Sequence, residues 1–261
     1  MSSRASQDWT ASLRQATSVQ VTAHRPWPLP RAPWISGQSW RDLLFAHWPV
    51  DPARLAPFVP DGLELDLWEG QAWLGVVPFE VIAVRARPFP PVPGLSRFLE
   101  ANLRTYVRHG DRPGVLFLTL EASSALAVSL ARALYRLPYH QASMAHVREG
   151  PWIDYRSERE RLRLKARYAA EGPACPAHEG SFDHFLVERY RLYTRSAGVL
   201  FRADIHHRPW RLQRVAAGSS VDVDLRALGG FTLGSGPHLR VAGLQDVVIW
   251  PLLPVGRSRQ A

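Results

Sequence analysis

The sequence predicts a mainly β protein with a few short helices, whose many strands form a large antiparallel sheet. Three observations predict this class: short runs of alternating apolar and polar residues recur, turn residues separate them, and few segments have helical spacing. A sheet with this many strands is expected to curl or close, because closure removes its exposed edges. The 261 residues, 46% of them hydrophobic, fit one large domain or two small ones with a substantial core.

The N-terminal part begins with residues 1–22, which are rich in Ser, Gln and Thr, and we expect a loosely ordered tail. The prolines of His24–Trp34 exclude regular structure from that segment, and a strand is predicted over Gln38–Trp48. Asp51 then caps a short helix over Ala53–Phe58, because aspartate followed by proline is a typical helix start.

The rest of the chain is predicted to be mostly strand. The clearest helix begins after Ser123 or Ser124, repeats leucine at every fourth position and ends at Pro138. A second short helix is capped by Ser181 and runs through Glu188. Residues 88–94 form a proline-rich loop. Strands are predicted at 63–67, Ala72–Arg87, Glu100–Val107, Val115–Ala122, Gln141–Arg148, Trp152–Ser157, Arg161–Ala170, Val199–Ile205 and Asp246–Leu253.

The predicted strand Glu100–Val107 carries an unusual polar face. Because side chains alternate between the two faces of a strand, one face presents Glu100, Asn102, Arg104 and Tyr106. If this row faces water, it is a solvated strand face, as is usual in antiparallel sheets. If it faces inward, it is the polar floor of a ligand pocket, because buried charge persists only when it is paired or functional. The alternation alone leaves both interpretations open.

The chain is basic, with a formal net charge of +9, and Lys165 is its single lysine. The arginines are spread along the chain, and the densest run, Arg156–Arg167, is interleaved with glutamate and leucine. Nucleic-acid binders usually gather their basic residues on one surface. We therefore interpret the run as a charged outer strand face, with a phosphate-binding surface as the minor alternative.

Several kinds of chemistry are disfavoured by the sequence. Cys175 is the single cysteine, so no intramolecular disulfide or cysteine zinc site is expected. Adjacent His206 and His207 point to opposite faces of a strand, so no metal site is predicted there. No nucleotide-binding glycine motif or hydrolase serine motif occurs, and helix capping explains the segment Ser181–His184. No signal-peptide core and no apolar run of membrane-spanning length is present, so we expect a cytoplasmic protein.

Several motifs in order along the chain resemble the YqjF-like family, a set of uncharacterised bacterial proteins classed as a domain of unknown function. They include H-R-P-W-P-L-P, W-R-D-L-L-F-A-H-W-P-V, E-A-N-L-R-T-Y-V and I-H-H-R-P-W, between about His24 and about Leu212. This family is similar in fold to acetoacetate decarboxylase, whose large antiparallel sheet is rolled into a cone or barrel around an internal cavity. The resemblance implies a single β-cone domain over residues 23–261 and a Glu100 row that lines the cavity.

One departure from the decarboxylases concerns the mechanism. Their G-x-P-K-K segment carries the lysine that forms a Schiff base with the keto substrate. The matching residues 136–140 read R-L-P-Y-H, so Tyr139 and His140 stand where the lysines would be. Lys165 shares a predicted strand face with arginines and is expected in water. The resemblance therefore implies the fold but argues against Schiff-base decarboxylation.

From these residues we predict binding of a small organic acid or carbonyl compound in the interior. Arg104 would hold a carboxylate or enolate oxygen, with Glu100 and Asn102 orienting it. Tyr139 and His140 would close the cavity. Glu100 and His140 are the candidate acids or bases.

Tyr106 and His206 complete the predicted binding residues, although the sequence does not decide whether His206 or His207 faces the cavity.

If chemistry follows binding, we expect a lyase, hydratase or isomerase reaction without cofactor or metal. Two hypotheses of other classes stay open: a nucleic-acid or polyanion binder that uses the arginine-rich strands, and a structural or regulatory protein whose cavity is filled by side chains. Ligand identity and oligomeric state are not determined by the sequence.

Overall fold

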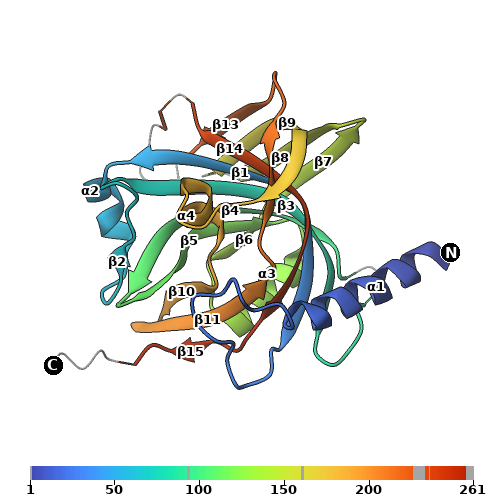
Figure 1. Cartoon of the computed structure of the whole chain (residues 1–261), viewed down its shortest axis with the longest axis horizontal. Coiled ribbons are helices and arrows are strands. Elements are labelled where there is room, and N and C mark those ends of the chain that lie inside the picture. The colour runs from blue at the N-terminus through green and yellow to red at the C-terminus, as the bar shows by residue number, and fades with distance from the viewer. Residues whose placement is uncertain (1, 93–94, 160–161, 226–232, 235, 257–261) are drawn as a thin grey trace.

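A computed structural model of the chain describes residues 2–92, 95–159, 162–225, 233–234 and 236–256 (Figure 1). Its helices are α1 (Ser2–Ser18), α2 (Pro52–Leu55), α3 (Ala125–Tyr135) and α4 (Phe182–Val187), with a 3-10 turn over Ala56–Phe58. Its strands are β1 (Ser36–Val50), β2 (Glu64–Leu65), β3 (Ala72–Ala86), β4 (Phe98–His109), β5 (Arg112–Ala122), β6 (Tyr139–Gln141), β7 (Ser143–Glu149), β8 (Trp152–Arg159), β9 (Leu162–Pro176), β10 (Arg191–Ser196), β11 (Val199–His207), β12 (Arg211–Val215), β13 (Ser220–Asp224), β14 (His238–Ile249) and β15 (Leu253–Pro254). The predicted mainly β class is confirmed.

Seven strands pair in a closed circuit, in the order β11-β10-β5-β4-β3-β1-β14, and the pairing of β14 with β11 returns the circuit to its start. We call this circuit the ring. Its pairings are antiparallel except for β10 with β5. Strand β6 also pairs with β5 in parallel, and α3 supplies the crossover that a parallel connection requires. The predicted closure of the sheet is therefore present, in a sheet that is mixed rather than purely antiparallel.

From β14 the sheet continues through β12, β9, β8 and β7, and β13 pairs with β9 on the edge opposite β8. These strands form a second layer, and β13, β9, β8 and β7 are seen along the top of Figure 1. Two separate apolar clusters result from the two layers. One lies inside the ring and includes Phe79 and Val247, and the other includes Leu103 of β4 together with Tyr155 and Leu164 of the second layer. Strand β4 therefore packs on both of its faces.

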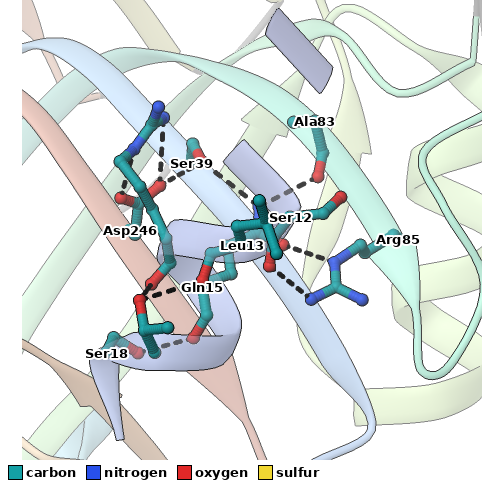
Figure 2. A network of polar contacts seen from close by, with 10 residues as sticks. Ser12, Leu13, Gln15, Ser18, Ser39, Ala83, Arg85 and Asp246 are labelled. Carbon is teal, nitrogen blue, oxygen red and sulfur yellow. Dashed lines mark hydrogen bonds and ion pairs between the residues drawn. The ribbon is translucent and has the colours of Figure 1, made fainter. Parts of the chain in front are cut away.

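The N-terminal segment differs from the expected loosely ordered tail, because residues 2–18 form helix α1 against the sheet. Gln15 is fully buried, and its Nε2 donates to Ser39 Oγ and to the Ala83 carbonyl, each at 3.1 Å (Figure 2). Arg85 Nε donates to Gln15 Oε1 at 2.7 Å, and Arg14 Nε donates to Asp246 at 2.8 Å. The polar composition suggested disorder because the sequence does not reveal that the sheet supplies a partner for these polar groups.

The helix caps agree with the sequence prediction. Asp51 accepts a hydrogen bond from Ala53 N at 2.9 Å, and Ser124, one of the two predicted caps, accepts from Ala127 N at 3.2 Å. Ser181 accepts from His184 N at 3.3 Å, so it caps α4 as predicted. Strands β12 and β13 were not predicted, and β9 extends beyond the predicted end at Ala170. Arg161, where that strand was predicted to begin, lies outside the described residues, as do residues 93–94 of the predicted loop. No described helix is long and apolar enough to cross a membrane.

The described basic residues of the arginine-rich run lie on the outer face of the second layer, except Arg159, which pairs with the buried Glu121. Arg163, Lys165 and Arg167 are exposed on β9. Their cross-strand neighbours include the acids Glu158 opposite Arg163, Asp154 opposite Arg167 and Asp222 opposite Lys165. The run is thus a solvated face in which acids are interleaved with bases, as we interpreted it from the sequence.

The docking of α1 depends on the absence of a side chain at Gly37. A Cβ at this position would lie 2.4 Å from Gln15 Oε1, closer than packed atoms approach. We expect Gly37→Ala to push Gln15 away from its partners and to lower the free energy of unfolding by about 1–3 kcal/mol. Urea unfolding measures the loss, and trypsin is expected to cleave faster after Arg14.

Gly243→Ala on β14 is the matched control, because a Cβ there meets nothing within 4 Å. If both variants unfold at the same urea concentration and resist trypsin alike, the proposed packing of α1 on Gly37 is incorrect.

Candidate functional site

The ring encloses a cavity of about 470 Å³. At one end, α3 and the loop after β3 form the mouth, with Leu130 of α3 and Phe89 of the loop in the lining. At the other end, α4 and the residues after it, including Val187 and Arg189, close the floor. Side chains do not fill this space, so the alternative of a filled interior does not hold.

The polar row of β4 faces this cavity. Glu100, Asn102 and Arg104 line it in order from the mouth side to the floor, and the first two side chains are about 5% exposed. The intervening residues Ala101 and Leu103 belong to the apolar cluster between the layers. The alternation that the sequence predicted is therefore correct, and its inward-facing interpretation describes the structure.

Glu100 forms a hydrogen-bonded pair with Tyr139, the first residue of β6. Tyr139 Oη donates to Glu100 Oε2 at 2.9 Å. Burial raises the pKa of Glu100 to about 8, against the opposing effect of the Tyr139 hydrogen bond. Burial and the charge of Glu100 together raise the pKa of Tyr139 well above its usual value. A carboxyl group that titrates near neutral pH is suited to proton transfer.

The outer layer holds the backbone of Glu100 in place. Tyr155 of β8 is fully buried, and its hydroxyl donates to the Glu100 carbonyl at 2.8 Å. The Phe79 carbonyl, on the neighbouring strand, lies 3.2 Å from the same hydroxyl. The second layer therefore fixes the backbone from which the Glu100 carboxyl group projects into the cavity.

Arg104 lies at the floor with no compensating acid. Among the residues that the structure describes, no carboxylate pairs with it, and its Nε is buried without a hydrogen-bond partner. Its nearest polar contact is Nη2 to the Leu186 carbonyl at 3.5 Å, a weak interaction. Asn102 Oδ1 is likewise buried and unpartnered in the described part of the chain. Glu100, which we expected to orient Arg104, is engaged with Tyr139 instead.

Two residues at the floor were missed by the sequence reasoning, Arg189 in the lining and His47 behind it. Arg189 lines the cavity and pairs with Asp66. His47 Nε2 lies 2.6 Å from the Tyr106 hydroxyl, and complete burial lowers the pKa of His47 well below its usual range, so the ring is neutral. His207 also lines the cavity. The alternation of β1 contained a signal for His47, which shares the inward face with Phe45.

Tyr106 follows Arg104 on the same strand face but lies below the cavity lining. It is fully buried, bonded to His47, and its ring lies under the Arg104 and Arg189 guanidinium groups. It therefore supports the floor instead of forming part of the surface that a ligand reaches.

Two predicted site residues lie outside the cavity, because alternation points them the other way. His206 faces the N-terminal segment, where its Nε2 donates to the Ser18 carbonyl at 3.0 Å and its Nδ1 accepts from Arg25 at 3.2 Å. Its neighbour His207 occupies the cavity side. His140 lies beside Arg132 on the opposite side of β6 from Tyr139, so it neither closes the cavity nor faces Glu100.

The remaining polar clusters do not add chemistry to the cavity. Ligand atoms of Asp42, Glu80 and His146 lie within 4.8 Å of one another, but Arg148 pairs with Asp42 and Arg41 pairs with Glu80. Because these arginines already neutralise the acids, the cluster does not fit a divalent cation. Lys165 is exposed on β9, and as the single lysine of the chain it leaves the cavity without a Schiff-base former.

Comparison with known proteins identifies similar sequences. The family DUF2071, described as an uncharacterized conserved protein, matches residues 37–244 of this chain. The uncharacterized protein YqjF of Bacillus subtilis (strain 168) is 45% identical over 227 residues, which cover 86% of this chain and 94% of YqjF.

Solved structures with a similar fold have low sequence identity. Acetoacetate decarboxylase from Legionella pneumophila superposes with a TM-score of 0.61 at 12% identity, over 92% of this chain and 95% of that one. The enduracididine biosynthesis enzyme MppR complexed with pyruvate gives a TM-score of 0.59 at 13% identity, over 92% of this chain and 96% of that one. The predicted acetoacetate decarboxylase-like fold is thereby confirmed, and at these identities the likeness extends to the fold alone.

The pKa of Glu100 predicts how stability depends on pH. The folded protein holds this proton up to about pH 8, whereas an ordinary glutamate releases it near pH 4.5. The stabilisation is therefore complete below pH 4.5 and is lost as the pH rises to 8, by at most roughly 1.4 kcal/mol per pH unit. Glu100→Gln removes this slope, which urea unfolding between pH 5 and pH 8 measures. Glu158→Gln, at an exposed position of β8, is the control and should retain the slope. Parallel stability profiles for the wild type and both variants would contradict the effect of burial on the pKa of Glu100.

Tyr139→Phe tests the hydrogen bond separately. The Tyr139 hydroxyl favours the charged form of Glu100, so its removal should raise the pKa of Glu100 further, by about one unit. The infrared band of the protonated carboxyl group should then persist to higher pH. Tyr193→Phe, which removes a buried hydroxyl bonded to the Arg112 carbonyl, is the control and should leave this band unchanged. An unchanged titration in Tyr139→Phe would mean that the pair is not coupled.

Proposed function

The chain belongs to the DUF2071 family of uncharacterized conserved proteins, and we propose that it binds a small organic acid or carbonyl compound in its cavity, with a carboxylate or enolate oxygen on Arg104. One observation carries the proposal: a guanidinium group lines the cavity and has no carboxylate partner among the described residues. An unpaired cation is unfavourable in an interior unless an anion binds to it. The guanidinium fork matches the two oxygens of a carboxylate.

Asn102 supports a polar ligand at the same place. It lies between Glu100 and Arg104 on the cavity wall, and its side-chain oxygen has no described partner. A hydroxyl or enol group of the ligand would satisfy it. Arg189 adds a second positive charge at the floor, although Asp66 already compensates that charge. Together these groups favour a monoanion over a dianion.

Glu100 is the proposed proton donor and acceptor. Its pKa of about 8 leaves it mostly protonated at neutral pH, with a fraction available as base. Tyr139 donates a hydrogen bond to Oε2 of Glu100, and this contact orients the carboxyl group. The second oxygen, Oε1, can then exchange a proton with a bound carbonyl or enol group. Since the cavity has no lysine, no covalent imine would form. The chemistry would be acid–base catalysis of a lyase, hydratase or isomerase reaction.

The relatives are consistent with an acid ligand but do not name it. MppR, of the same fold, is complexed with pyruvate, which is a small keto acid. The interleaved acids of the second layer weaken the alternative of a nucleic-acid binder, because paired arginines are less available to phosphate.

Thermal unfolding against a panel of keto acids, hydroxy acids, acyl compounds and phenols tests the proposal. A ligand at 100 times its Kd adds roughly 2.7 kcal/mol of stability, or several degrees in Tm. We expect such a shift in the wild type with at least one acid, and its loss in Arg104→Met.

Arg108→Met is the matched control, because this arginine lies on the same strand but is exposed and pairs with Glu64. It should keep the ligand-dependent shift. No shift with any acid, or the same shift in Arg104→Met, would overturn the proposal. Binding of single-stranded DNA at low salt would favour the nucleic-acid alternative instead.

A further inference from the structure

We propose, resting on the acid site described above, that the ligand is an amphipathic monocarboxylate: its acid group binds at Arg104 and an extended apolar tail runs along the cavity to the mouth between α3 and the loop after β3. Short keto acids of two to four carbons would then be poor ligands. The argument uses the arrangement of the polar groups, the length of the cavity and the surface around its mouth.

Arg104 lies toward the floor of the cavity and has no described carboxylate partner. Arg189 and His207 lie there too, with Asn102 next to them, whereas the wall nearer the mouth is formed by apolar side chains such as Phe98 and Leu120. Glu100 and Tyr139 interrupt this apolar wall, and their mutual hydrogen bond satisfies one oxygen and the phenol. Arg85, Gln38 and Ser96 also line the cavity, and each is hydrogen-bonded to another group of the protein. A small polar ligand would leave most of this wall without a partner, while an apolar tail would cover it.

The cavity is also long. Phe98 and Arg104 both line it and are six residues apart on one strand. At about 3.4 Å per residue their Cα atoms are separated by roughly 20 Å. The volume of about 470 Å³ lies within the range of about 300–1,000 Å³ that holds drug-sized ligands. A ligand parallel to β4 with its acid on Arg104 therefore has room for a chain of many carbons.

The apolar lining continues out to the surface. Leu126, Leu130 and Leu134 on α3 line the cavity and are 44% to 57% exposed. On the facing loop, Phe89 and Leu95 also line it and are 66% and 56% exposed. Single exposed apolar side chains are common, but a group that surrounds the opening of a cavity marks a binding surface. These residues would contact the distal part of the tail.

Isothermal titration with acetate, butyrate, octanoate and dodecanoate tests the inference on the full chain. Each added CH₂ that enters the cavity should tighten binding about fourfold. The affinity should therefore rise more than a hundredfold between butyrate and octanoate. Arg104→Met should weaken octanoate at least tenfold, and octan-1-ol should bind much more weakly than octanoate to the wild type.

Leu130→Gln tests the path of the tail without touching the acid site. Because this residue is about half exposed, its substitution should leave the fold intact, which the Tm checks. We expect roughly threefold to tenfold weaker dodecanoate binding and unchanged butyrate binding. Leu244→Gln on β14 is the matched control, since Leu244 is 49% exposed and lies outside the cavity lining.

The outcomes separate this inference from the function it rests on. If acetate binds as tightly as octanoate and Arg104→Met abolishes the binding of both, the proposed acid site is supported and the proposed apolar tail is incorrect. If octan-1-ol binds as well as octanoate in wild type and in Arg104→Met, the acid site itself is wrong. If dodecanoate binding is equally affected by Leu130→Gln and Leu244→Gln, the tail does not leave through the mouth between α3 and the loop.

Discussion

Strand β4 has to satisfy two different environments at once. One face turns Ala101 and Leu103 toward the second layer, where they pack with Tyr155 and Leu164. The other face turns Glu100, Asn102 and Arg104 into the cavity. Because side chains alternate strictly, shifting the register by one residue would bury the polar row in the apolar layer and expose the apolar row to the cavity. The position of the site and the packing of the outer layer thus depend on the same constraint.

The separation of Glu100 from Arg104 gives each group its chemical state. Burial without a nearby cation raises the pKa of Glu100 to about 8, with Tyr139 as its hydrogen-bond donor. Arg104, four residues along the strand, has no described carboxylate partner. Had the two side chains paired, the carboxylate would be charged and the guanidinium satisfied, and neither would be available to a ligand. Their spacing therefore leaves a carboxyl group with a raised pKa and a guanidinium group without a described carboxylate partner on one wall of the cavity.

Elements outside the ring hold this arrangement in position. Tyr155 anchors the Glu100 backbone from the second layer, and α4 covers the floor beneath Arg104. Helix α1 reaches the outside of the same sheet through Gln15, which contacts both β1 and the end of β3. Since Arg85 at the end of β3 also lines the cavity, the mouth and the N-terminal helix share one residue. The second layer, α4 and α1 thus pack around the strands that carry the polar interior.

The sequence by itself determined the mainly β class, the helix caps, the alternating faces of β4 and the absence of a Schiff-base lysine, because each rests on local periodicity, capping chemistry or residue identity. Alternation also established that His206 and His207 face opposite ways, whereas the sequence predicted both Tyr139 and His140 at the cavity and only Tyr139 lines it. Only the tertiary structure decided which member of each pair faces the cavity, since that depends on strands far away in the chain. The same holds for Arg189 and His47 at the floor, for the pairing of Glu100 with Tyr139, and for α1, whose polar residues are ordered by partners on β1, β3 and β14. Local rules fix the direction of a side chain relative to its neighbours, whereas its burial and its pKa depend on what the closed sheet brings against it.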